Sequence, residues 1–292
     1  MPPDRRSFLA ASAAGGVFAL AGAARAADRP GRTKNTKFAV NVEMWWSREK
    51  DFLKRLEAAA ALGFTAVEFW PFESKNVPAV AETCQRLGLD VAQFTVWGFK
   101  PGLNEPKNHA AFVEKVEKGC EAAKTLKCNL MTVVAGDDVS GMSQEQMHAN
   151  VIEGLKKAAP IAERHGVTLI LEPMNIRVDH KGHCLYGSAP AIKIVQAVGS
   201  KAVKLNWDLY HMHITEGDLC GHLREGFAAD AIAYIQLADH PGRNEPGTGE
   251  LNYSRVLKEL KALKYDGWVG LECVPKRSEA EAAQAVHNAD NW

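Results

Sequence analysis

From residue 38 to its C-terminus, the sequence alternates eight times between a short apolar run and a longer segment with helical periodicity. The apolar runs are residues 38–43, 65–70, 89–96, 129–135, 167–172, 203–208, 233–238 and 268–274. Most of them are apolar nearly throughout, which is typical of parallel strands that are covered on both faces. Eight strand–helix units also fit the usual size of a (β/α)₈ barrel, ~250 residues.

The segments between the runs carry recognisable helix ends. Gly63 and Gly88 each follow a predicted helix, at a position where a left-handed residue commonly ends one. Ser143 and Gln146 form a capping box that predicts a helix start. The expected helices cover residues 50–62, 77–87, 108–126, 143–165, 189–198, 219–227, 253–263 and 278–286.

A doubly wound open sheet is the alternative α/β fold for such an alternation. That fold usually carries a glycine-rich phosphate turn after its first strand. Residues 41–46, Asn-Val-Glu-Met-Trp-Trp, contain no such turn. We therefore predict the α/β class and a single (β/α)₈ TIM barrel over residues 38–292.

The first 26 residues have the features of a targeting segment. Arg5 and Arg6 precede an Ala/Gly-rich run, and Ala24-Arg25-Ala26 is a small-residue pattern suited to cleavage. The segment resembles a twin-arginine export signal, and its apolar run is shorter than the ~20 residues of a membrane span. We expect a cleaved signal over 1–26, a linker over 27–37, and a periplasmic or secreted protein without a stable membrane anchor after processing.

The charge balance limits the kinds of binding partner that we expect, and the cysteine spacing indicates whether disulfides form. Lys+Arg and Asp+Glu are both 35, so there is no global basic field for sequence-independent nucleic-acid binding. We expect no nucleic-acid partner, and the sequence leaves a homo-oligomer open. The six cysteines show no Cys-x-x-Cys spacing, which favours buried free thiols over a disulfide framework.

Polar side chains end four successive apolar runs. Because the carboxyl ends of barrel strands meet at one mouth, these side chains should converge there. Three of the four are carboxylates, which would repel one another in a partly dehydrated site unless a cation neutralised them. Oxygen ligands favour a hard divalent ion, so we predict a Mg²⁺ or Mn²⁺ site. The residues are Glu172, Asp208, Gln236 and Glu272.

Four motifs resemble the hydroxypyruvate isomerase branch of the xylose isomerase-like barrels. They are Gly63–Phe69, Glu172-Pro173-Met174-Asn175-x-Arg177, Asp208–Met212 and the long block Gln236–Glu250. The resemblance implies a divalent metal held by the four strand-end residues, with Glu172 and Glu272 as the proton-transfer pair. It also implies that His211 and Arg243 contact substrate oxygens.

Three further residues are candidates for substrate contact. Glu68 lies near the end of the second run, and His213 lies in the loop after the sixth. Trp45 belongs to a set of tryptophans after the first three runs, and aromatic faces stack on the apolar faces of sugars. Pairing of Glu68 with a basic residue and packing of Trp45 under the rim stay open. His180 and His183 are expected to be solvated loop residues.

These features predict an enzyme that isomerises or epimerises a small sugar or hydroxy-keto acid. One glutamate would remove a proton next to a carbonyl, and a glutamate would return it to the enediolate. A hydride shift stays open as a variant of an aldose–ketose isomerase. The competing functions are a lyase or dehydratase of the keto-inositol or dehydroshikimate type and a non-catalytic periplasmic sugar-binding protein.

Overall fold

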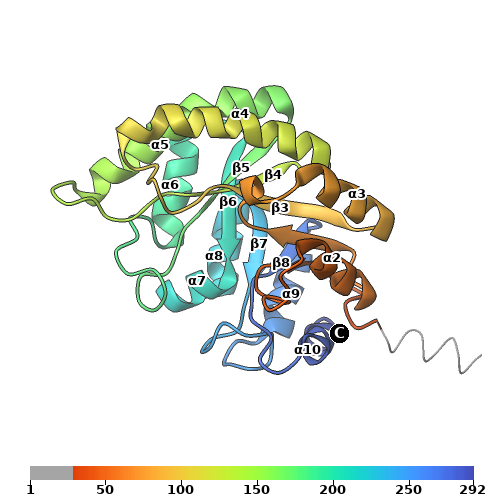
Figure 1. Ribbon diagram of the computed structural model, residues 1–292. Coiled ribbons are helices and arrows are strands. Elements are labelled where there is room, and N and C mark those ends of the chain that lie inside the picture. Colours follow the sequence, from red (N-terminus) through yellow and green to blue (C-terminus); the bar gives the residue numbers. More distant parts are fainter. Residues whose placement is uncertain (1–28) are drawn as a thin grey trace, which may run out of the picture.

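The computed structural model describes residues 29–292, which form a closed barrel of eight parallel strands (Figure 1). The strands follow one another in chain order, and the last pairs with the first. This closure confirms the single TIM barrel and excludes the open sheet. The strands are β1 Lys37–Asn41, β2 Ala66–Phe69, β3 Asp90–Trp97, β4 Leu130–Val134, β5 Thr168–Glu172, β6 Val203–Asp208, β7 Ile232–Leu237 and β8 Trp268–Leu271.

Helices surround the strands (Figure 1), and their bounds agree with the helix signals to within a few residues. Ser143 and Gln146 form the expected capping box, and Gly88 ends its helix in the left-handed region at φ 68°. The helices are α2 Phe52–Ala61, α3 Val77–Leu87, α4 His109–Leu126, α5 Gln144–His165, α6 Ser188–Val198, α7 Leu209–Thr215, α8 Leu219–Ala228, α9 Tyr253–Ala262 and α10 Glu279–Ala289, with short 3₁₀ turns at Phe72–Ser74 and Pro106–Asn108.

The helix α7 was not expected from the sequence. It follows β6 directly, and Asp208 caps it by accepting a hydrogen bond from the Tyr210 N–H. The short helix places residues 209–212 in its first turn, where their side chains are buried. The segment after β6 is therefore a fixed part of the barrel mouth.

The barrel interior contains a polar network around Glu68. Its carboxylate accepts hydrogen bonds from Asn41, Gln93, Tyr234 and Gln236, at 2.7–3.1 Å. Gly270 of β8 lies against the same carboxylate, and a Cβ atom there would overlap Glu68 Oε2. A larger residue at 270 would therefore displace the network.

The N-terminal segment of the described chain contacts the C-terminal end of α10. The buried Asp290 carboxylate accepts hydrogen bonds from the N–H groups of Lys34, Asn35 and Thr36 and from the Thr36 hydroxyl. Residues 34–36, within the predicted linker, are thus held against the barrel. The predicted export signal over residues 1–26 lies outside the described residues.

Two further features of the described residues concern disulfides and membrane-spanning helices. All six cysteines lie in the described part and are free; five are buried and Cys220 is half-buried. Between residues 29 and 292, none of the helices has both the length and the apolar character needed to cross a membrane.

Candidate active site

The carboxyl ends of the strands surround a cavity of about 370 Å³. Such a mouth is where barrel enzymes hold their reacting groups. One part of its lining is charged or polar and the rest is apolar or aromatic. The lining residues are Trp70, Pro71, Thr95, Gly98, Phe99, Val134, Glu172, Met174, His180, His211, Arg243 and Glu272.

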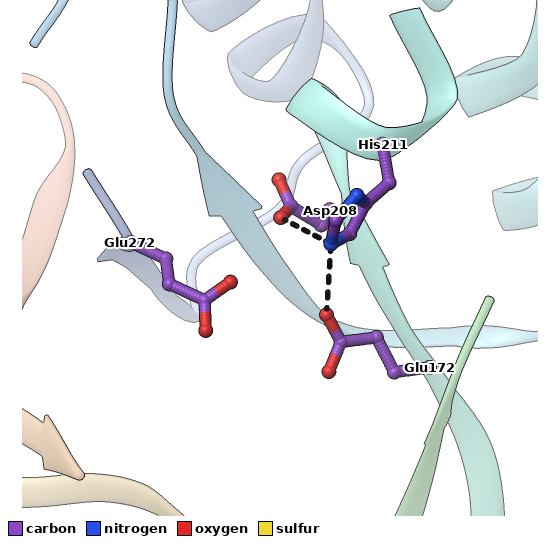
Figure 2. A group of neighbouring side chains, drawn as sticks. All are labelled: Glu172, Asp208, His211 and Glu272. Atoms are coloured by element: carbon purple, nitrogen blue, oxygen red, sulfur yellow. Dashed lines mark ion pairs between the residues drawn. The ribbon is translucent and has the colours of Figure 1, made fainter. Parts of the chain in front are cut away.

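Four buried side chains that could hold a metal ion converge beside this cavity (Figure 2). One potential ligand atom from each lies within 4.8 Å of the others. Glu172 ends β5, Asp208 ends β6, His211 lies in the first turn of α7, and Glu272 follows β8. Figure 2 shows Glu172 and Glu272 reaching toward the same space, the first from the end of β5 and the second from the residue after β8.

Arg243 is the cation of this cluster. Its Nη2 donates to Glu272 Oε2 at 2.7 Å and lies 3.6 Å from Asp208 Oδ2. The guanidinium lies over the Tyr210 ring, 5.1 Å from its centroid. One guanidinium against three buried carboxylates leaves an excess of negative charge, which a divalent cation or protons would neutralise.

The electrostatics of the site follow from this excess. Burial, and then the negative charges of Glu272 and Asp208, raise the pKa of Glu172 well above its usual value. Burial and the charge of Glu272 likewise raise the pKa of Asp208. Burial alone would lower the pKa of Arg243, but the carboxylates of Glu272, Asp208 and Glu172 raise it. Because these carboxyl groups are buried, each additional negative charge in the cavity is energetically unfavourable.

The donor set fits a hard divalent cation. Asp208 Oδ2 is buried and has no hydrogen-bond partner among the described residues. Gln236 is the register partner of Asp208 on the neighbouring strand, so both side chains leave the sheet on the same side. The Gln236 Oε1 accepts a hydrogen bond from Asn206, and a carbonyl oxygen keeps a second lone pair. Carboxylate and amide oxygens are the ligands that Mg²⁺ and Mn²⁺ prefer.

Comparisons with known proteins place the chain in a family. Residues 56–290 match the family model described as xylose isomerase-like TIM barrel. The chain belongs to the xylose isomerase-like TIM-barrel family. It is 34% identical to hydroxypyruvate isomerase of Escherichia coli (strain K12) over 246 residues, which cover 82% of this chain and 94% of that protein. It is 36% identical to 2-oxo-tetronate isomerase of Cupriavidus necator over 250 residues, covering 82% and 93%.

A solved structure agrees with the fold of this family member. The crystal structure of an AP endonuclease, family 2, from Brucella melitensis has a TM-score of 0.79 and 27% identity, and the alignment covers 85% of this chain and 96% of that one. The chain is thus hydroxypyruvate isomerase-like in sequence, and the Escherichia coli and Cupriavidus necator relatives both carry the name of an isomerase.

Three residues of this xylose isomerase-like chain that we expected to contact substrate lie elsewhere. Within residues 29–292, none of Glu68, His213 and Trp45 lines the cavity. Glu68 is fully buried in the barrel interior, where burial and the charge of Glu272 raise its pKa to about 7. His213 pairs with Glu250 at 2.8 Å, and the buried Trp45 indole donates to the Leu271 carbonyl.

Two histidines depart from the expectation of solvated loop residues. His180 lines the cavity, where its ring stacks on Phe99. It also packs edge-on against the His211 ring, with 5.3 Å between the two ring centroids. His183 is buried, and neither ring nitrogen has a hydrogen-bond partner among the described residues. Burial lowers the pKa of His183 to about 3, so its ring is neutral. The loop after β5 therefore forms a wall of the cavity.

Proposed function

We propose that this protein is a metal-dependent isomerase or epimerase of a small hydroxy-keto acid or sugar. The observation that carries the proposal is the pair of buried glutamates, Glu172 and Glu272, that reach into one cavity beside Arg243. The names of the relatives, hydroxypyruvate isomerase and 2-oxo-tetronate isomerase, support a hydroxy-keto acid as the substrate class.

Glu172, Asp208, Gln236 and Glu272 would hold the ion, which we propose to be Mg²⁺ or Mn²⁺. When bound, a divalent ion supplies positive charge for the carbonyl and hydroxyl oxygens of the substrate and for the negative charge that develops on them. The unpartnered Asp208 Oδ2 and the excess negative charge of the cluster are the structural support for this assignment.

The two glutamates would move the proton. One carboxylate removes the proton from the carbon that bears the hydroxyl, and the bonding electrons pass into the adjacent carbonyl to give an enediolate. Isomerisation follows if the proton returns to the neighbouring carbon and the hydroxyl proton passes to the former carbonyl oxygen, so that the carbonyl and the hydroxyl exchange places. Epimerisation follows if the proton returns to the other face of the same carbon. Burial raises the pKa of Glu172, which brings this carboxyl nearer to the range that suits a general acid or base.

Arg243 would bind an anionic or hydroxyl group of the substrate. Its Nη2 is occupied by Glu272, but its Nε is buried and has no hydrogen-bond partner among the described residues. A planar guanidinium with a free donor suits a carboxylate oxygen. The aromatic and apolar wall of Trp70, Phe99 and Met174 would exclude water from the opposite part of the cavity.

Glutamine substitutions test the proton pair. Glu172→Gln and Glu272→Gln keep an oxygen and nearly the same volume but cannot accept a proton, so turnover should fall by about 10²–10⁴-fold. The assay follows hydroxypyruvate and four-carbon 2-oxo acids in deuterated water with saturating Mn²⁺, with deuterium incorporation at the hydroxyl-bearing carbon next to the carbonyl as the readout. Glu250→Gln, at an exposed position beside His213, is the matched control. Exchange at the wild-type rate in both variants would exclude the two glutamates as bases.

The same assay separates the competing functions. A dehydratase would expel a β-hydroxyl as water, and a sugar-binding protein would bind substrate without any exchange. An endonuclease activity, which the name of the Brucella melitensis protein suggests, fits the lining less well. Arg243 is the one Lys or Arg among the cavity-lining residues of the described chain, and it is paired with Glu272.

We also propose that the protein is exported through its N-terminal segment. Replacing Arg5 and Arg6 together by Lys should leave the protein in the cytoplasm, because the arginine pair is the feature on which the export signal rests. Fractionation of cells that express either version checks this. An unchanged periplasmic fraction would refute the assignment.

A further inference from the structure

The amide of Asn175 has an orientation that its neighbours determine. Its Oδ1 accepts hydrogen bonds from the backbone N–H groups of Val178 and Asp179, at 3.0 and 3.1 Å. Two N–H donors require the oxygen on that side, so the NH₂ group occupies the other. Its Nδ2 lies 2.8 Å from Asp179 Oδ2 and 2.7 Å from His211 Nδ1.

This orientation determines which nitrogen of His211 carries the proton. An amide NH₂ group can only donate, so His211 Nδ1 accepts and bears no hydrogen. The neutral imidazole then carries its proton on Nε2. Nε2 lies 3.6 Å from Asp208 Oδ2 and 3.8 Å from Glu172 Oε1, distances too long for hydrogen bonds. The N–H group is therefore left free for another acceptor in the cavity.

One contact favours the opposite tautomer. Arg243 Nη2 lies 3.5 Å from His211 Nε2, and a guanidinium is also only a donor. A neutral imidazole has a single acceptor nitrogen, so the two contacts cannot both be hydrogen bonds. The Asn175 contact is shorter by 0.8 Å. Arg243 Nη2 also has a carboxylate acceptor of its own, Glu272 Oε2 at 2.7 Å.

We propose that Asn175 is a positioning residue that holds His211 as an Nε2–H donor and so keeps it out of the metal's ligand set. Metal-ligating histidines almost always donate their other ring N–H to a carboxylate or carbonyl, whereas here that nitrogen accepts. Of the four side chains of the buried cluster, only the carboxylates of Glu172, Asp208 and Glu272 then remain as ligands. The Nε2–H group donates to a substrate oxygen, a part of the inference that rests on the proposed function.

The tautomer is measured directly on the protein without metal or substrate. The ¹⁵N chemical shifts of the imidazole distinguish a protonated from an unprotonated nitrogen, and loss of a signal in His211→Gln assigns it. The wild type should show a bare Nδ1 and a protonated Nε2. The reverse pattern in the wild type would overturn the proposal, whatever the isomerase assay shows. Conversely, a protein without isomerase activity but with this pattern would refute only the proposed function.

Two substitutions at Asn175 test its role. Asn175→Asp is made together with Asp179→Asn, so that the new carboxylate does not face a second one at 2.8 Å. It replaces the donor by an acceptor, so Nδ1 becomes protonated and Nε2 becomes bare. Zn²⁺ affinity should then rise by about tenfold or more, because the substitution creates the carboxylate–histidine pair found behind ligating histidines. Asn175→Ala, which adds no charge, should give a mixture of the two tautomers. The matched control Asp179→Asn alters the other partner of the same amide and should keep the wild-type pattern. An unchanged ¹⁵N pattern in either Asn175 variant would overturn the proposal.

Discussion

The two oxygens of Asp208 have different surroundings, which makes this residue a sharp test of the metal site. Oδ1 caps α7 through the Tyr210 N–H at 2.9 Å, and Oδ2 is buried without a hydrogen-bond partner among the described residues. Asparagine caps helices about as well as aspartate, so Asp208→Asn should keep the fold while one ligand charge is lost. We expect Mn²⁺ affinity to fall by at least about tenfold.

Calorimetric titration with Mn²⁺ measures the effect of Asp208→Asn, and circular dichroism checks that α7 is intact. Glu250→Gln again serves as control, because it removes an exposed carboxylate of the loop between β7 and α9. Equal Mn²⁺ affinities of wild type and Asp208→Asn would remove Asp208 from the ligand set.

A carboxylate at the end of a strand does not always turn toward the mouth of the barrel. Glu172 and Asp208 end their strands and reach the cluster as expected. Glu68 also lies near the end of a strand, but its side chain turns into the barrel interior. The donors that hold it there, such as Gln93 and Tyr234, are 25 and 166 residues away in sequence. Contacts across the barrel of this kind leave no local pattern in the sequence.

His180 and Asn175 show the same limit in a loop. Both belong to the segment between β5 and α6, whose polar composition suggests solvent exposure. The segment instead folds back so that His180 stacks on Phe99 of a different loop. The Glu-Pro-Met-Asn motif was part of the family resemblance, but the bond from Asn175 to His211 depends on the three-dimensional path of the loop.

At the scale of the elements, periodicity predicted the strands well because each apolar run is buried along most of its length. The run 203–208 coincides with β6, and each of the others differs from its strand by one to three residues at one or both ends. The run 268–274 is the longest overestimate, since β8 ends at Leu271. After Leu271 the chain continues beside the loop of Arg243, whose carbonyl accepts from the Val274 N–H. Cys273 is buried although it lies beyond the strand, and by its residue type alone it cannot be distinguished from a residue within the strand.

The loop that follows β7 is held by a buried side chain, Asp239. Its carboxylate accepts hydrogen bonds from the N–H groups of His240, Gly247 and Leu251. The loop it spans carries Arg243, which stands in the left-handed region at φ 52°. Asp239 therefore stabilises the element that brings the guanidinium to the carboxylates.

We expect Asp239→Asn to loosen this loop without unfolding the barrel. An amide has one acceptor oxygen in place of two, so at least one of the three N–H groups loses its partner. Hydrogen exchange of peptides that cover residues 240–251 should speed up, while that of β5 and β6 stays the same. The KM for substrate should rise more than kcat falls, because the proposed mechanism has Arg243 bind substrate and the two glutamates move the proton. Unchanged exchange in the loop would show that Asp239 does not restrain it.

At the scale of the whole molecule, barrel closure brings together groups that are distant in the chain. The site combines Glu172 and Glu272, 100 residues apart in the sequence, because β5 and β8 belong to one closed sheet. The closure depends on the pairing of β1 with β8, near which the chain enters and leaves the barrel. Stability at this seam therefore supports the geometry of a site at the opposite ends of the same strands.

Substitutions of Asp290 test how much the contacts beside the β1–β8 pair, here called the seam, contribute to stability. Its Oδ2 accepts three backbone N–H groups from residues 34–36, and its Oδ1 accepts from the Thr36 hydroxyl. Asp290→Ala leaves these donors without their acceptor, and we expect the free energy of unfolding to fall by about 2–4 kcal/mol. Asp290→Asn is the matched variant, because its carbonyl oxygen can still accept the three N–H groups while its NH₂ donates to the hydroxyl. It should lose at most about 1 kcal/mol.

Urea unfolding of the metal-free protein, followed by circular dichroism, gives the free energies for both Asp290 variants. Glu57→Ala removes an exposed ion pair with Arg86 and should change the free energy by less than about 1 kcal/mol, which sets the size of a surface effect. If Asp290→Ala unfolded at the same urea concentration as Glu57→Ala, the bonds to residues 34–36 would contribute nothing to the seam. Residues 34–36 would then contribute nothing to the free energy of unfolding, in agreement with the predicted linker over residues 27–37. A large loss for Asp290→Ala with a small one for Asp290→Asn would instead make the folded unit begin at about residue 34, before β1.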